Sequence, residues 1–135
     1  MRILKPVGEE IDFDGKTRHL LFNINVIDDI QEHFDMYIVD VLNSVFETEN
    51  KEIQKKSYDT LSYILTSLLN EDVRMHNKNN TEDQWDEITE EYIKEELLTN
   101  GTSMVLGSLV LKSFNGSLPK TEEDDPNQKT GQKKK

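Results

Sequence analysis

The chain contains neither cysteine nor alanine, and its 16 basic residues are 13 lysines and only 3 arginines. Without cysteine, the chain has no disulfide framework, no thiol nucleophile and no thiolate metal site. Alanine is the best helix former, so its absence does not reflect a folding preference. We interpret this composition as that of an AT-rich gene, in which codons rich in A and T are favoured.

Long apolar runs are also absent from the sequence. The densest, residues 104–111, falls well short of the roughly 20 residues that a membrane-spanning helix needs. The opening segment MRILKPVGEE lacks the apolar region of a signal peptide. The sequence therefore predicts a protein that neither spans a membrane nor is secreted, and that acts in the cytoplasm.

Positive charge is scarce in the body of the chain. The formal net charge is −11, although residues 117–135 carry five lysines against four acidic residues. Residues 1–116 therefore carry a net charge of −12. A surface of this sign repels phosphate groups, which argues against nucleic acid as a partner.

The 135 residues divide into a predicted folded domain, 1–116, and a predicted disordered tail, 117–135. Leu118 is the only large apolar residue of that tail. Its full burial would contribute roughly 1.5–3 kcal/mol, whereas ordering the backbone costs roughly 1–2 kcal/mol for each residue. The remaining 116 residues are enough for one domain with its own core.

The first predicted element is a β-hairpin in the segment EIDFDGKTRHLLF. Asp14-Gly15 lies between two runs of strand-forming residues and suits a tight two-residue turn. Leu20, Phe22 and Ile24 alternate with other residues, which predicts that the second strand continues through them. A two-stranded ribbon of this kind needs helices to cover its apolar face.

Helical periodicity dominates the rest of the chain. A first apolar stripe predicts a helix with Asn25 as its N-cap, and consists of Ile27, Ile30, Phe34, Ile38, Val41 and Val45. A second stripe predicts a helix that ends near Asn70, and consists of Ile53, Ser57, Leu61, Ile64 and Leu68. We interpret the polar residues 71–80 as a loop.

Two further helices are predicted before the last one. Thr81 and Gln84 have the spacing of a capping box, which predicts a short helix over residues 85–88. Thr89 is expected to cap the next helix, with Asn100-Gly101 as its stop.

The last helix, in the segment TSMVLGSLVLKSFNG, is apolar nearly all round. We expect it at the centre of the fold, with Leu106, Leu109 and Val110 in the core and Gly116 as its stop. The predicted fold is mainly α: a small helical bundle with an N-terminal β-hairpin and a disordered C-terminal tail.

No motif of the sequence predicts a cofactor or a catalytic centre. In EIDFDG, the acidic residues match the first positions of a calcium loop, but the twelfth position is Leu21 instead of the bidentate Glu. His19, His33 and His76 lack the spacing of a zinc site. The chain has no nucleophile elbow and no phosphate-binding glycine loop. We therefore expect a protein that is not an enzyme. We expect Trp85 to be a packing anchor rather than a platform for a ligand.

The end of the chain, FNGSLPKTEEDDPNQKTGQKKK, resembles the tail assembly chaperones of long-tailed phages that infect low-GC Gram-positive bacteria. The resemblance depends on a helix that closes on Phe114, the Ser117-Leu118-Pro119 segment, an acidic stretch, Asp125-Pro126-Asn127 and a polar end with Gly, Gln and Lys. The rest of the chain is similar to that family in length, order of elements and charge.

This resemblance implies a non-catalytic protein of virion morphogenesis. Proteins of this family bind the tape measure protein and tail tube subunits in the host cytoplasm, and a longer product of the same gene is commonly made by ribosomal frameshifting. That longer product is a further expected partner, and so is a second copy of the chain. The candidate partner-binding or tether residues of this chain are Phe114, Leu118, Glu122, Glu123, Asp124 and Asp125, and those next to the frameshift are Lys133, Lys134 and Lys135.

Two other classes of function remain open at this stage. An acidic helical protein can mimic nucleic acid and occupy a basic groove on a host or phage protein, which requires carboxylates in two rows at phosphate-like spacing. A hydrolase that uses one of the many carboxylates requires a deep pocket and a carboxylate of raised pKa.

The terminal lysines predict a slippery site in the gene. Lysine is encoded only by AAA or AAG, so Lys133-Lys134-Lys135 in an AT-rich gene predicts an adenine run on which tRNAs can re-pair after a one-base slip. We expect a minority longer protein that leaves the frame near Gln132. Sequencing the gene and mass spectrometry of junction peptides from infected cells check this. An interrupted adenine run without an overlapping frame would contradict it and would leave the alternative, a lysine-rich end that keeps the chain soluble.

Overall fold

The computed structural model describes residues 8–47, 49–98 and 102–118. These residues form a mainly helical fold with an antiparallel hairpin near the N-terminus, as the sequence predicted. The predicted helix stop at Asn100-Gly101 and the tail beyond Leu118 lie outside the described residues. No helix of the described segments is long and apolar enough to cross a bilayer.

The hairpin consists of β1 (Glu10–Phe13) and β2 (Lys16–His19), with Glu10 paired to His19. Asp14 and Gly15 have φ angles of 56° and 68°, as a tight primed turn requires. The expected continuation of the second strand to Ile24 is wrong. Residues 20–22 are all buried, so burial does not alternate along this segment. Ile24 is 67% exposed and is the first residue of a helix.

The predicted first helix is two helices in the structure, α1 (Ile24–Phe34) and α2 (Ile38–Ser44). Asp35 adopts a left-handed conformation, with φ of 54°, that ends α1. The side chain of Gln31 then accepts a hydrogen bond from the backbone of Ile38 at 2.8 Å. The expected cap Asn25 is also wrong, because Asn23 caps α1 through the backbone N–H of Val26.

Helix α3 (Lys51–Asn79) continues nine residues beyond its predicted end at Asn70. Its N-terminus is capped by Asn50, which accepts from the backbone N–H of Ile53 at 2.9 Å. The residues taken for a polar loop stay helical because the returning chain packs on them. The side chain of Asn70 pairs with both backbone groups of Ile88, each at 2.7 Å.

The predicted short helix over residues 85–88 is also wrong, because this segment runs extended along α3. The side chain of Asn77 holds both backbone groups of Trp85, at 2.7 and 3.0 Å. Thr89 then caps α4 (Glu90–Tyr92) as predicted, by accepting from the backbone N–H of Tyr92. The π-helical turn η1 (Ile93–Leu97) follows directly.

Helix α5 (Ser103–Ser117) is not central, contrary to expectation. Its Leu106, Val110 and Phe114 are buried, but Met104 and Val105 are each 61% exposed. The predicted stop at Gly116 is wrong as well, because the helix continues through that residue. The centre of the fold is α3.

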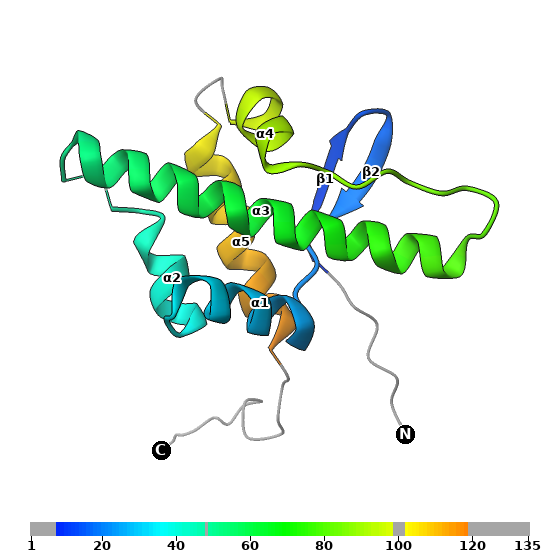
Figure 1. Ribbon diagram of the computed structural model, residues 1–135, viewed down its shortest axis with the longest axis horizontal. Helices are drawn as coiled ribbons and strands as arrows, with labels where there is room; N and C mark the ends of the chain where they lie inside the picture. The colour runs from blue at the N-terminus through cyan, green and yellow to red at the C-terminus, as the bar shows by residue number, and fades with distance from the viewer. Residues whose placement is uncertain (1–7, 48, 99–101, 119–135) are drawn as a thin grey trace, which may run out of the picture.

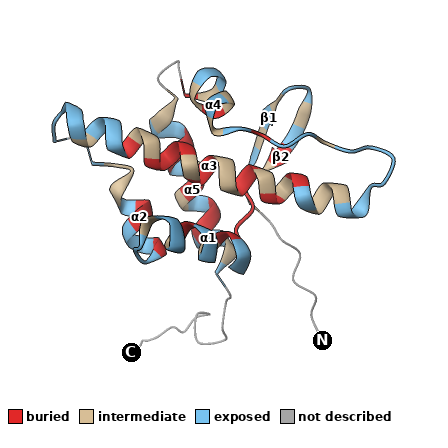
Figure 2. Cartoon of the chain, in the orientation of Figure 1, coloured by how far each residue is buried: buried red, intermediate tan, exposed pale blue. Residues whose placement is uncertain are grey.

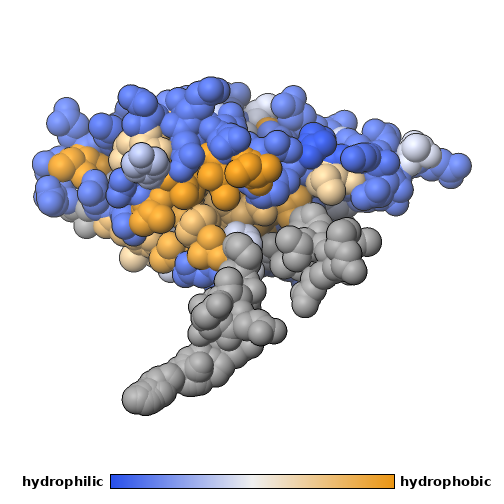
Figure 3. Space-filling view, turned by 90° about the horizontal axis from the view of Figure 1, so that it is seen from below, coloured by the Kyte–Doolittle hydropathy of each residue, from blue (hydrophilic) through white to orange (hydrophobic). Residues whose placement is uncertain are grey.

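Figure 1 shows α3 crossing the molecule, with α1 and α2 on one side and the hairpin and α4 on the other. Contacts join α3 to α1, α2, α4, α5, η1 and β2. Buried residues concentrate in the middle of α3, as Figure 2 shows. In Figure 3, apolar side chains gather on the face seen from below, the side of α3 that carries α1 and α2.

Replacing a central α3 leucine should cost more stability than replacing Leu109 of α5. Leu65 is fully buried, whereas Leu109 is only partly buried. We expect Leu65→Ala to lower the free energy of unfolding by about 2–5 kcal/mol, and Leu109→Ala to lower it by less. Urea denaturation of both variants checks this. A larger loss of stability for Leu109→Ala would contradict this and would indicate that α5 lies at the centre of the core.

Candidate functional site

A pocket of about 220 Å³ lies between the hairpin and the extended segment that precedes α4. Its aromatic lining consists of Phe13, Trp85 and Tyr92. Its charged lining consists of Lys16, Arg18, Asp14, Asp86 and Glu87. The pocket therefore joins apolar ring surfaces to both signs of charge in a space that fits a single small group.

Arg18 is the most unusual residue of this pocket, because it carries a charge and is only 3% exposed. The guanidinium carbon lies 4.6 Å from the ring centroid of Phe13 and 4.9 Å from that of Trp85. Neither Nε nor Nη1 has a hydrogen-bond partner among the described residues. The two rings are thus the main surroundings of this buried cation.

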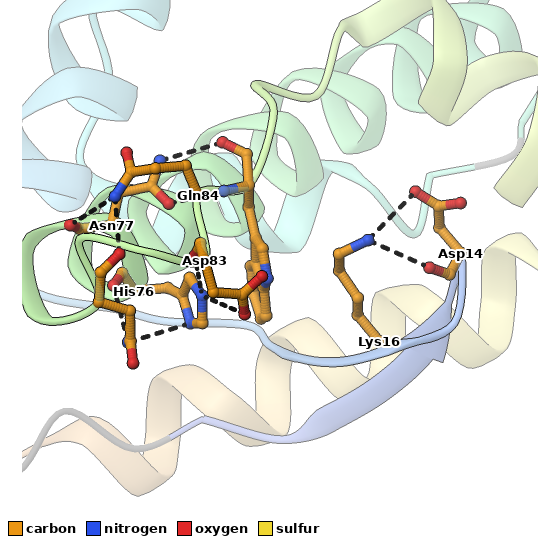
Figure 4. Close-up of polar contacts among 8 residues, drawn as sticks. Asp14, Lys16, His76, Asn77, Asp83 and Gln84 are labelled. Carbon is orange, nitrogen blue, oxygen red and sulfur yellow. Dashed lines mark hydrogen bonds and ion pairs between the residues drawn. The ribbon is translucent and has the colours of Figure 1, made fainter.

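The nearest carboxylate to Arg18 belongs to Asp14 and is a weak partner. Its Oδ2 lies 3.9 Å from Nη2 of Arg18, beyond hydrogen-bond distance. The same oxygen lies 3.9 Å from Nζ of Lys16, a contact drawn in Figure 4. The Asp14 side chain is 65% exposed, so solvent screens both interactions.

Trp85 is held by packing and by its backbone, which confirms the expectation of a packing anchor. Its ring stacks on His76, with centroids 3.7 Å apart and an angle of 13° between the planes. His76 in turn contacts Asp83, as Figure 4 shows. The same Trp85 ring lies over Arg18 and lines the pocket, which the sequence did not predict.

Arg18 itself was missed by reasoning from the sequence, although a signal exists. Residues two apart on a strand point to the same face, and Arg18 lies two residues before Leu20, an expected core residue. The alternation of inward and outward positions along the strand thus indicated that the charged residue at position 18 points inward. It pairs across the hairpin with Ile11.

A wider hollow of about 540 Å³ lies between α1, α3 and the start of α4. Asp29 organises one end of it by accepting hydrogen bonds from the hydroxyls of Tyr63 and Ser67. Burial and the neighbouring Asp29 carboxylate raise the pKa of Tyr63 to about 12. This tyrosine therefore stays neutral across the physiological range.

The other end of this hollow carries a buried carboxylate, Glu71, in a hydrogen-bonded network. Arg74 donates to both carboxylate oxygens, at 3.0 and 2.6 Å, and Asn23 donates to one of them. The hydrogen bonds from Arg74 hold the pKa of the Glu71 carboxyl below its usual 4.5, against the opposing effect of burial. Glu71 ties α3 to the cap residue of α1 and stays ionised.

The described residues contain no group of three His, Asp or Glu side chains placed to hold a metal ion. The histidines lie apart and pack individually. His33 stacks on Tyr63 with centroids 3.8 Å apart, and His19 lies near Asp72 and Glu10.

An exposed apolar corner joins α1 to α2. Met36, Tyr37 and Val39 are 43%, 76% and 52% exposed. Asp35 and Asp40 flank them, and Met36 and Tyr37 line a shallow hollow with these two acids. We call Met36, Tyr37 and Val39 the apolar corner.

The structure separates the residues that the sequence singled out near the C-terminus. Phe114 lies in the core, where its ring packs edge-on against Phe22 at 5.4 Å. Leu118 follows α5 and is 46% exposed. The acidic residues Glu122, Glu123, Asp124 and Asp125 and the terminal lysines Lys133, Lys134 and Lys135 lie outside the described residues.

Replacing Glu71 should change how stability depends on pH. A carboxyl with a lowered pKa in the folded state contributes stability above its unfolded pKa, and that contribution disappears as the pH falls through the folded pKa. We expect Glu71→Gln to be destabilised at pH 7, with the gap to the parent chain closing below pH 4.5. Urea denaturation from pH 3 to pH 8 measures this, with the exposed Glu82→Gln as control. A gap that stays constant with pH would contradict it.

Comparison of the chain with protein-family models, with curated proteins and with solved structures finds no match.

Proposed function

We propose that this chain is a non-catalytic phage tail assembly chaperone, which binds the tape measure protein and tail tube subunits in the host cytoplasm during tail morphogenesis. The resemblance of the segment from Phe114 to the end of the chain carries this proposal. The composition supports it, since an AT-rich gene agrees with a phage of low-GC hosts.

The apolar corner supports the proposal from the side of the folded body. An exposed group of a methionine, an aromatic and a branched residue can cover apolar side chains of a partner helix. Among the large apolar residues that the structure describes, Tyr37 is the most exposed, at 76%. The surrounding surface belongs to a chain with a net charge of −11, which keeps a complex with an aggregation-prone partner soluble.

The proposal assigns different roles to the body and to the end of the chain. The body covers apolar surface of the partner, and the segment after Leu118 links it to the extension made by the longer frameshift product. Binding of this kind needs no nucleotide, because masking apolar surface is itself favourable.

Co-expression tests this function directly. The tape measure protein of the same phage should gain soluble yield when it is co-expressed with this chain, and the two should co-purify. We expect Tyr37→Ser with Val39→Ser to lose most of this effect, because these substitutions remove exposed apolar area. Lys51→Ser with Lys55→Ser, at exposed positions of α3, is the matched control.

Two outcomes would count against the proposal. Unchanged solubility with no co-purification would remove the chaperone function. Full activity of the Tyr37 and Val39 double variant would be compatible with the chaperone function, but it would show that the partner binds outside the apolar corner. Circular dichroism of each variant separates a lost contact from a lost fold.

A further inference from the structure

Arg18 is a buried cation that lacks hydrogen-bond partners for two of its nitrogens among the described residues. Removing a charged group from water is costly, and buried charges are therefore normally paired and hydrogen-bonded. The described residues supply two aromatic rings and one distant carboxylate, but no hydrogen-bond acceptor for Nε or Nη1. A cation–π contact compensates only part of the lost hydration.

A purely structural role would not require a charge at this position. An unbranched apolar side chain of similar length would fill the space between the rings of Phe13 and Trp85 without a desolvation cost. Arg18 also lies in the lining of the 220 Å³ pocket, with Lys16 beside it. A buried cation with few partners, next to a cavity, suits the binding of an anionic group.

We propose that this pocket binds a carboxylate group, with Arg18 as its main partner. Nη2 is the guanidinium nitrogen that such a group would reach, because Nε and Nη1 are enclosed. A charged acceptor forms a stronger hydrogen bond with it than a neutral acceptor does. The carbon chain of the carboxylate would lie against the rings of Phe13, Trp85 and Tyr92, which line the same pocket. The volume fits the side chain of an acidic residue or a small carboxylic acid, and is below the range of most ligand sites.

The three acidic residues of the pocket disfavour an anion that carries more than one negative charge. Arg18 and Lys16 attract an anion, whereas Asp14, Asp86 and Glu87 line the same space and repel additional negative charge. Phosphate carries more charge than a carboxylate at neutral pH and should bind less well. Asp14 is the residue that the ligand competes with, because its carboxylate already lies 3.9 Å from Arg18.

This binding is independent of the proposed chaperone function, because it needs no partner protein. Trp85 is the only tryptophan of the chain and lies over Arg18, so its fluorescence reports on the pocket. The full chain is titrated with sodium propionate while sodium chloride keeps the ionic strength constant. A parallel titration uses a short capped peptide with one Glu, and the same peptide with Gln in its place.

Arg18→Met is the test variant, and Lys112→Met, which removes the same charge from an exposed site, is its control. We expect a saturable change of Trp85 fluorescence with propionate, at least tenfold weaker in Arg18→Met and unchanged in Lys112→Met. Tighter binding of the Glu peptide than of propionate, with no binding of the Gln peptide, would identify a peptide carboxylate as the ligand. Equal binding of propionate would identify a free acid.

Thermal unfolding provides a second readout that does not depend on fluorescence. Without ligand, Arg18→Met should melt at the same temperature as the parent chain or higher, because the unpaired cation is gone. Propionate should raise the melting temperature of the parent chain and leave that of Arg18→Met unchanged. Equal affinity in both chains, no saturable response by either readout, or an equal response to sodium phosphate would overturn the proposal.

Discussion

Burial of one apolar stripe along α3 is the interaction on which the rest of the fold depends. Leu61, Ile64, Leu65, Leu68 and Leu69 are all at most 2% exposed, and they face elements on more than one side of the helix. Each of the other helices is too short to be stable by itself. They persist because α3 offers them a common surface, so a defect in this stripe weakens the contacts that α3 makes with α1, α2, α4, α5, η1 and β2.

The sequence predicted those features that depend on local chemistry. The Asp14-Gly15 turn and the Thr89 cap form as expected, because each is specified by two to four neighbouring residues. The apolar positions of α3 were also readable, since they repeat at helical spacing. Each of these features is specified by residues that lie close together in the sequence.

Several of the errors have a different cause, which is contact with residues distant in the sequence. The segment after Asn70 looked like a loop because its residues are polar, yet the side chains of Asn70 and Asn77 hold the returning extended segment against α3. Asp35 breaks the first stripe, although the apolar spacing continues across it. The Arg18 pocket could not be predicted at all, because it forms only when residues some 70 positions apart come together.

The apolar corner and the Arg18 pocket lie on opposite sides of α3, with α1 and α2 on one side and the hairpin on the other (Figure 1). A ligand in the Arg18 pocket therefore does not obstruct binding of a partner at the apolar corner. Both surfaces depend on the same helix for their position, because α3 contacts α1, α2 and β2.

The length of α3 has a consequence for how the domain opens. Its 29 residues extend about 44 Å, and its last buried residue is Val73. The final turn of α3 is therefore secured by side-chain hydrogen bonds from Asn77, Asn80 and Gln84 rather than by core packing. Amide hydrogens along this single helix should exchange at graded rates, slowest around Leu65 and fastest near Asn79.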